Sequence, residues 1–217
     1  MKIHVHIPKS GGTSLLDLLK NNESVLRLNN NAGWKQFNHA GNHTLVSAHM
    51  PYGLHYQINE PCEYITFLRN PIDRLISFYT YIKKKGRGKW FEQLGHLSLG
   101  EFLFSDVCDN EMVRYLSGSQ DITPHGTRQK MTFKDLETAV KNLQTFKFVG
   151  FVDNYDEDVN RLCDLYNWQH RELPHLLKTQ HKRAEELSPA LYNKAMNKHK
   201  LDVMLFATAV QLFKNIN

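Results

Sequence analysis

The sequence of 217 residues lacks several features that would place it in a special class of protein. It contains no run of about eighteen apolar residues, so no transmembrane segment is expected. A strand-like pattern begins almost at Met1, which leaves no room for a signal peptide. The three cysteines, Cys62, Cys108 and Cys163, are far apart and form no C-x-x-C pair. We therefore expect reduced thiols in a cytoplasmic protein.

Internal repeats, low-complexity tracts and linkers rich in Pro, Gly or Ser are also absent. The length therefore fits a single domain over residues 1–217. A composition with 41% hydrophobic and 23% charged residues is ordinary for a globular protein. The net charge of +5 favours an anionic ligand or acceptor, but it does not distinguish a nucleotide from a nucleic acid or an acidic glycan.

Short apolar segments alternate with helical patterns along the chain, which indicates an α/β fold. Strands are expected at residues 2–7, 43–49, 63–68 and 146–151. Helices are expected from Ile72, over 132–143, near 157–166 and from Leu187 onward, with two short ones within 98–117. The Asn-rich residues 21–42 are expected to be irregular. We predict a P-loop-like, three-layer fold with a mostly parallel central sheet of about four to five strands flanked by helices.

The segment from His6 to Ser14 joins the first predicted strand to a helix through a glycine turn. This geometry directs backbone N–H groups and the positive end of a helix toward one point, where an anion can bind. Gly11 and Gly12 let the backbone approach the anion closely, and Thr13 and Ser14 add hydroxyl donors. The alternative interpretation is a plain glycine turn between strand and helix.

The loop is not a Walker A motif, which has the pattern G-x-x-x-x-G-K-[ST]. When the second glycine of that motif is aligned with Gly11, His6 occupies the position of the first glycine and Gly12 that of the lysine. The lysine lies upstream instead, as Lys9. The loop thus lacks the Lys-Ser/Thr pair that binds a γ-phosphate and Mg²⁺.

Three polar residues fall at or just after the carboxyl ends of predicted strands: Lys9, His49 and Arg69. In open parallel sheets, ligands bind at this edge. Arg69 is followed by Asn70, a plausible helix N-cap, and by Pro71 at the first helical position. The convergence of these residues predicts one site that combines anion binding with a histidine.

Two motifs together resemble those of a known family. They are Pro8–Ser14 (PKSGGTS) and Arg69–Ser77 (RNPIDRLIS), in which Ser77 follows Arg69 by eight residues. The chain resembles the sulfotransferases, in particular the heparan sulfate 2-O- and 6-O-sulfotransferases and their bacterial relatives. Weaker similarities follow at Ala48–Gly53 (AHMPYG), which is similar to the family's histidine-bearing segment, and at Asn110–Gly118 (NEMVRYLSG), which is similar to its acceptor-side helix.

The resemblance implies a fold, a reaction and a set of roles. The loop residues Pro8, Lys9, Ser10, Gly11, Gly12, Thr13 and Ser14 would hold the 5′-phosphosulfate of 3′-phosphoadenosine 5′-phosphosulfate (PAPS). Arg69 and Ser77 would hold its 3′-phosphate. The sulfuryl group would pass to an acceptor hydroxyl, which we expect to belong to a carbohydrate, with no metal and no nucleic-acid partner.

Chemistry assigns the catalytic roles within this implied reaction. Charge grows on the bridging oxygen during sulfuryl transfer, and Lys9 is placed to stabilise it. A histidine titrates in the range needed to take the acceptor's proton, and His49 matches the family's base. For His49 alone, the alternative is a core histidine satisfied by hydrogen bonds. Arg69 and Ser77 could likewise be a helix-start residue and a surface hydroxyl.

Other charged residues have simpler interpretations. Arg74 could pair with Asp73 or with another carboxylate, and the basic run 83–89 is either a solvated helix end or a contact surface for an anionic acceptor. His4 and His6 have the spacing of two metal ligands, but no third ligand is spaced to join them.

The chain also departs from its relatives, and other functions compete. We expect no N-terminal Golgi anchor of the kind that the eukaryotic glycan sulfotransferases carry, and the sequence is shorter than most of theirs. Residues 176–182 could close over the adenine, and His125 is the histidine that competes with His49 for the role of base.

Two other functions compete with sulfuryl transfer. A small-molecule kinase would need a lysine after Gly12, which is absent. A non-catalytic polyanion-binding module would explain the charge but not the three strand-end residues.

Overall fold

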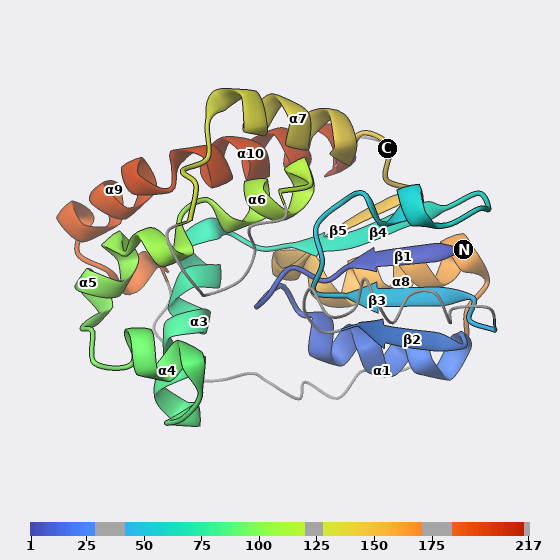
Figure 1. Cartoon of the computed structure of the whole chain (residues 1–217), viewed down its shortest axis with the longest axis horizontal. Coiled ribbons are helices and arrows are strands. Elements are labelled where there is room, and N and C mark those ends of the chain that lie inside the picture. The colour runs from blue at the N-terminus through green and yellow to red at the C-terminus, as the bar shows by residue number, and fades with distance from the viewer. Residues whose placement is uncertain (29–41, 120–127, 171–183, 215–217) are drawn as a thin grey trace.

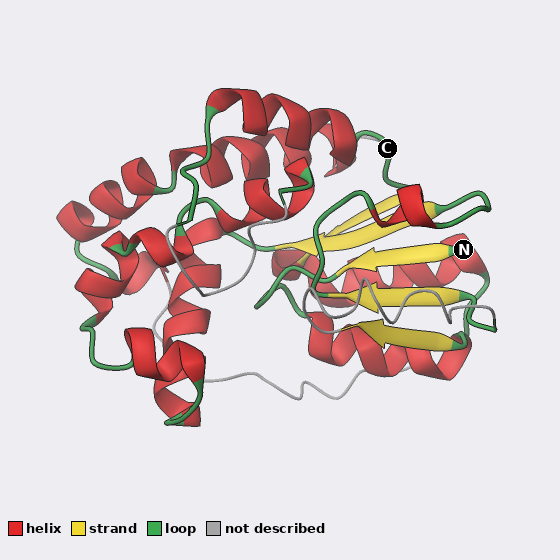
Figure 2. Ribbon diagram, in the orientation of Figure 1, coloured by secondary structure: helices red, strands yellow, loops and turns green. Residues whose placement is uncertain are grey.

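The computed structural model describes residues 1–28, 42–119, 128–170 and 184–214. Its centre is a five-stranded sheet in the order β2-β3-β1-β4-β5, and every neighbouring pair is parallel. The strands are β1 (Lys2–Val5), β2 (Val25–Leu28), β3 (Leu45–Ala48), β4 (Glu63–Leu68) and β5 (Phe148–Phe151). Helices flank the sheet (Figure 2), which confirms the predicted α/β three-layer architecture.

The sheet differs from the prediction in two places. Strand β2 lies within residues 21–42, so the expectation of irregular structure is wrong for Val25–Leu28. These four residues pair with β3 at the edge of the sheet. Strand β1 ends at Val5 rather than at residue 7, because the Ile7 N–H turns back to the Val5 carbonyl at 3.1 Å. The loop therefore begins two residues earlier than predicted.

Two groups of helices cover the two faces of the sheet (Figure 1). Helices α1 (Gly12–Asn22) and α8 (Tyr155–Tyr166) pack on one face around a core that includes Leu15, Ile65 and Leu162. Helices α6 (Glu111–Ser117), α7 (Phe133–Leu143) and α10 (Lys200–Lys214) pack on the other face around Val46 and Val149.

A third group of helices lies beyond the carboxyl ends of the strands (Figure 1). It consists of α3 (Pro71–Lys85), α4 (Lys89–Leu94), α5 (Leu99–Phe104) and α9 (Pro189–Lys198), and it has a separate core around Leu75 and Phe102. Short 3-10 helices are η2 (Leu54–Gln57), η3 (Asp106–Cys108), η4 (Val152–Asn154) and η5 (Ala184–Glu186). None of the described helices combines the length and the apolarity needed to cross a bilayer.

Helix α3 begins and ends where its sequence signals predict. The Asn70 side chain accepts from the N–H groups of Ile72 and Asp73 at 3.0 and 3.3 Å, and Pro71 occupies the first turn, where no N–H partner is needed. Gly86 ends the helix in the left-handed conformation at φ 61°. The basic run 83–89 is thus divided between the end of α3 and the start of α4.

A buried polar network joins the third group of helices to α6 and α10. Arg74, only 1% exposed, faces the Asp202 carboxylate at 4.0 Å, which identifies the carboxylate partner that the sequence left open. Asp202 also accepts from the N–H groups of Met112 and Val113 at 3.2 and 2.9 Å, so it caps α6. In return, the Asn110 side chain accepts from the Asp202 N–H at 2.9 Å. The two helices α6 and α10 therefore cap each other.

Candidate active site

The structure brings the three strand-end residues together at the carboxyl edge of the sheet. Arg69 Nη1 donates to the Lys9 carbonyl oxygen at 3.4 Å, which joins the end of β4 to the loop after β1. His49 Nδ1 lies 2.8 Å from the His6 carbonyl oxygen, which joins the end of β3 to the same loop. Helices α3 and α1 start at this edge (Figure 1). The convergence predicted for Lys9, His49 and Arg69 is present.

Within the described part of the chain, backbone N–H donors are left without a partner at the start of α1. The first helical bond runs from the Leu15 N–H to the Gly11 carbonyl at 3.2 Å, so the N–H groups of Gly12, Thr13 and Ser14 precede any intrahelical bond. The Ser10 hydroxyl is buried and finds no hydrogen-bond partner among the residues that the structure describes. A buried polar group without a partner is costly, and an oxyanion at this helix start would satisfy it. The donor set therefore fits a phosphate or sulfate group.

Both loop glycines are packed too tightly for any side chain. A Cβ on Gly11 would lie 2.6 Å from the ring of Tyr155, and the φ of Gly11 is 76°. A Cβ on Gly12 would lie 2.0 Å from Nε2 of His6. Tyr155, at the start of α8, also donates its hydroxyl to the Gly11 carbonyl at 3.0 Å. The glycines are thus required by close contacts as well as by backbone conformation.

The His49 side chain has the tautomer that a general base needs. A carbonyl oxygen can only accept, so Nδ1 carries the proton in its bond to the His6 carbonyl, and Nε2 keeps the lone pair. The ring stacks on that of His6 with a centroid distance of 4.0 Å. Burial is the main cause that lowers the pKa of His49, and the Arg27 cation also lowers it, while the bond to His6 works in the opposite sense. His49 is therefore neutral at neutral pH.

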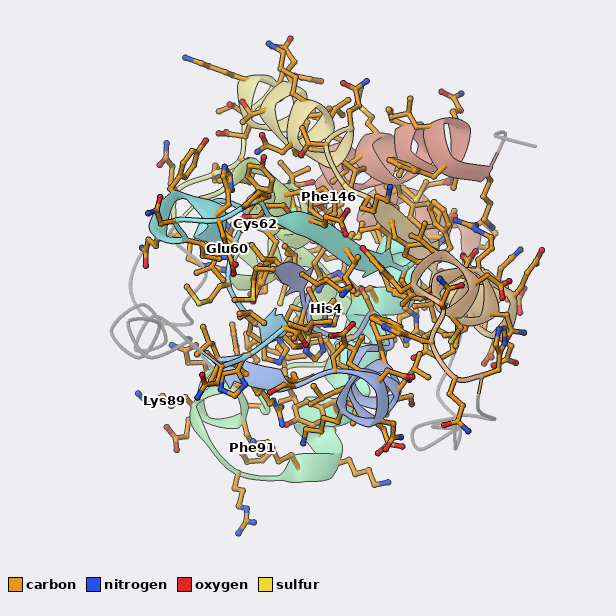
Figure 3. All side chains as sticks on the ribbon, turned by 90° about the vertical axis from the view of Figure 1, so that its right-hand side faces the viewer. His4, Glu60, Cys62, Lys89, Phe91 and Phe146 are labelled. Atoms are coloured by element: carbon orange, nitrogen blue, oxygen red, sulfur yellow. The ribbon has the colours of Figure 1, made fainter. Side chains whose placement is uncertain are left out.

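His4 and His6 continue the row of rings behind His49. The centroids of His4 and His6 are 5.2 Å apart, and His4 Nδ1 lies 2.9 Å from the Ser47 hydroxyl. Burial lowers the pKa of His4 to about 3 and that of His6 well below its usual value. Figure 3 shows His4 in the interior of the molecule. Both side chains are buried behind the loop.

The Lys9 side chain rests against helix α3. Its Nζ lies 4.5 Å from the centroid of the Tyr81 ring. The backbone of Lys9 has φ 70°, a left-handed conformation that is uncommon for a residue with a side chain. Burial, and to a smaller extent the nearby Arg69 guanidinium, lower the pKa of Lys9 to about 8. The site thus holds an ammonium group whose charge is easily lost.

Ser77 and the remaining loop residues complete the predicted set. Ser77 lies on the buried side of α3, and its hydroxyl makes no side-chain hydrogen bond with the described residues. Thr13 is exposed, whereas Pro8 and Ser14 are half-buried. The predicted adenine segment 176–182 and His125 lie outside the described residues.

Three residues near the site were not predicted from the sequence. Tyr155 contacts Gly11 from 144 positions away, and no local pattern signals such a contact. Arg27 lies on β2, the strand that was not predicted. Tyr81 could have been found, because it follows Ser77 by one helical turn on α3.

This edge of the sheet combines hydrogen-bond donors for an anion, a cation and a neutral imidazole. These are the groups that an acyl, phosphoryl or sulfuryl transfer requires.

Comparison with known proteins adds an independent observation. The chain resembles in structure a sulfotransferase from Alicyclobacillus acidocaldarius, with a TM-score of 0.54 and 13% identity over 97% of this chain and 95% of that one. It also resembles mouse sulfotransferase SULT7A1 in complex with PAP, with a TM-score of 0.50 and 11% identity over 95% of this chain and 88% of that one. At such low identities the likeness concerns the fold alone. No curated protein is significantly similar in sequence.

The sequence itself matches a family model over nearly its whole length. The match extends over residues 3–207 and includes the loop, the end of β3 and the start of α3. The chain belongs to the sulfotransferase family.

Proposed function

We propose that the protein transfers a sulfuryl group from PAPS to the hydroxyl of an acceptor, and that the acceptor is a carbohydrate. The observation that carries the proposal is the convergence of Lys9, His49 and the Arg69 side chain on the loop before α1. Membership of the sulfotransferase family supports the reaction class. The same family match, over residues 3–207, supports a single domain along the chain.

The donor supplies a sulfur atom whose bond to a phosphate oxygen breaks as its bond to the acceptor oxygen forms. We assign the 5′-phosphosulfate to the loop, where Ser10 and the N–H groups of residues 12–14 offer donors. We assign the 3′-phosphate to Arg69 and Ser77. A guanidinium presents several donors to a dianion at once, which a single hydroxyl cannot do.

The chain's own residues then have three tasks. The Lys9 ammonium stabilises the charge that grows on the leaving oxygen, which departs with 3′-phosphoadenosine 5′-phosphate. His49 Nε2, which carries the lone pair, takes the proton of the acceptor hydroxyl. The His6 carbonyl keeps His49 in this tautomer through its bond to Nδ1.

A kinase of the P-loop type remains the alternative, and ligand binding separates the two. We expect 3′-phosphoadenosine 5′-phosphate to raise the melting temperature equally in EDTA and in Mg²⁺, because a ligand that binds only the folded state stabilises it. ATP with Mg²⁺ should produce a smaller shift. A strict requirement for Mg²⁺, or a preference for ATP, would contradict the proposal. Transfer of labelled sulfate to a panel of glycans and small hydroxylated metabolites then tests the class of acceptor.

A further inference from the structure

The Tyr81 ring lies beneath the ammonium group of Lys9. The distance from Lys9 Nζ to the ring centroid is 4.5 Å, within the range of a cation–π interaction. No carboxylate within the described residues lies at ion-pair distance from this ammonium. The ring is therefore the contact that offsets the loss of water around a cation whose pKa is lowered by burial.

The backbone of Lys9 is strained and is held in place by Arg69. A left-handed φ of 70° is unfavourable for a lysine, and such strain persists only where the surroundings hold it. Arg69 bonds to the Lys9 carbonyl at 3.4 Å, so the end of β4 holds the backbone while α3 holds the ammonium. Both contacts come from the same continuous segment, 69–81.

Tyr81 lies on the same side of α3 as Ser77, one helical turn further along. Ser77, Tyr81 and Lys85 follow one another at intervals of four residues, so they form one stripe along the helix. Lys85 Nζ lies 5.6 Å from the same ring, so two cations share it. Tyr81 is 41% exposed, and a residue of this kind is not needed to fill the core.

We propose that Tyr81 is a positioning residue, whose ring holds the ammonium of Lys9 at the place where the leaving oxygen will be. The inference depends on the proposed function, because it assumes that Lys9 acts on the donor. The ring acts through Lys9 and needs no contact with the reacting atoms. Its hydroxyl is not required for this role, but the negative face of the ring is.

The test compares Tyr81→Phe, which keeps the ring face, with Tyr81→Leu, which keeps an apolar side chain without it. We expect Tyr81→Phe to retain the parent turnover, whereas Tyr81→Leu should lose about 2- to 30-fold, the range of a single cation–π contact. A series of increasingly fluorinated phenylalanines at position 81 should lower turnover step by step, because fluorine weakens the ring's negative face at nearly constant shape.

A second background shows whether Tyr81 acts through Lys9. In Lys9→Ala, the change Tyr81→Leu should have no further effect on the affinity for 3′-phosphoadenosine 5′-phosphate or on residual turnover. Phe133→Leu is the matched control. Phe133, at the start of α7, is also exposed, and the Lys200 Nζ lies 5.2 Å from the centroid of its ring. This control should leave turnover unchanged, and melting temperatures should show that every variant folds.

The outcomes separate this inference from the proposed function. If Lys9→Ala is impaired while Tyr81→Leu equals the parent, the inference is wrong and the proposed function stands. An equal loss for Tyr81→Phe and Tyr81→Leu, or an undiminished effect of Tyr81→Leu in the Lys9→Ala background, also contradicts it. If the parent protein does not bind 3′-phosphoadenosine 5′-phosphate at all, the proposed function fails first.

Discussion

At the scale of single residues, the proposed reaction requires an uncharged His49 and a positively charged Lys9. His49 must be neutral to accept a proton, so activity is lost as the pH falls through its pKa. Because burial lowers that pKa, the acid limb of kcat/KM should lie below the ordinary value of about 6.5. Lys9 must be charged, so activity is lost as the pH rises through its pKa of about 8. We expect a bell-shaped profile for the free enzyme.

His49→Ala tests the assignment of the base. Turnover should fall about 10²- to 10⁴-fold, the usual effect of removing a general base, and the acid limb should disappear. The affinity for 3′-phosphoadenosine 5′-phosphate should stay nearly unchanged, because the acceptor hydroxyl lies beyond the sulfuryl group. Lys9→Ala should lower both affinity and turnover, with turnover affected more. His125→Ala is the comparison: if it is inactive while His49→Ala keeps its turnover, His49 is not the base.

At the scale of elements, the loop between β1 and α1 depends on glycine at position 11. Gly11→Ala should weaken binding of 3′-phosphoadenosine 5′-phosphate at least tenfold, because the new Cβ meets the Tyr155 ring at 2.6 Å and displaces the loop. Gly86→Ala is a matched control, since its φ of 61° imposes similar strain but nothing lies within 4 Å of the new Cβ. It should cost about 1–2 kcal/mol of stability, measured by urea unfolding, and leave binding intact. Equal binding by both variants would show that the contact with Tyr155 is unimportant.

Elements with local signals could be predicted from the sequence, whereas those that depend on distant partners could not. Asn70 and Pro71 define the start of α3 within its own segment, and this start was predicted to within one residue. Strand β2 was missed because only Leu28 of its four residues is buried, and because the strand pairs with β3 about twenty positions later. The site follows the same rule: Lys9, His49 and Arg69 share a recognisable position at strand ends, but the contact of Tyr155 with Gly11 spans 144 residues.

At the scale of the whole molecule, buried polar groups join the third group of helices to α6 and α10, which cover one face of the sheet. Asp202 faces Arg74 at 4.0 Å and caps α6, so Asp202→Ala leaves a buried guanidinium and two N–H groups without their partner. We expect a loss of about 3–5 kcal/mol in the free energy of unfolding, measured in urea at neutral pH. Asp202→Asn should lower the free energy of unfolding by less. Burial already raises the pKa of Asp202 to about 6, so the site favours an uncharged group.

The same pair of variants separates stability from function. Neither is expected to change the affinity of the folded protein for 3′-phosphoadenosine 5′-phosphate, because Asp202 makes no contact with the loop or with Arg69 among its described bonds. A loss of affinity without a loss of stability would place Asp202 in the binding site instead. Arg74 thus fixes α3 in the core through Asp202, whereas we assign the 3′-phosphate to Arg69, which precedes the helix, and to Ser77 within it.

The assignment of the 3′-phosphate to Arg69 is tested by the affinity of Arg69→Ala for two nucleotides that differ only in that phosphate. By calorimetry, its affinity for 3′-phosphoadenosine 5′-phosphate should fall about 10- to 100-fold, because a charge-assisted contact contributes about 1.5–3 kcal/mol. Its affinity for adenosine 5′-phosphate should hardly change. Because Arg69 also bonds to the Lys9 carbonyl, the ratio of the two losses is the informative quantity. A selective loss is the predicted result, and an equal loss for both nucleotides would contradict the assignment of this edge of the sheet as the donor site.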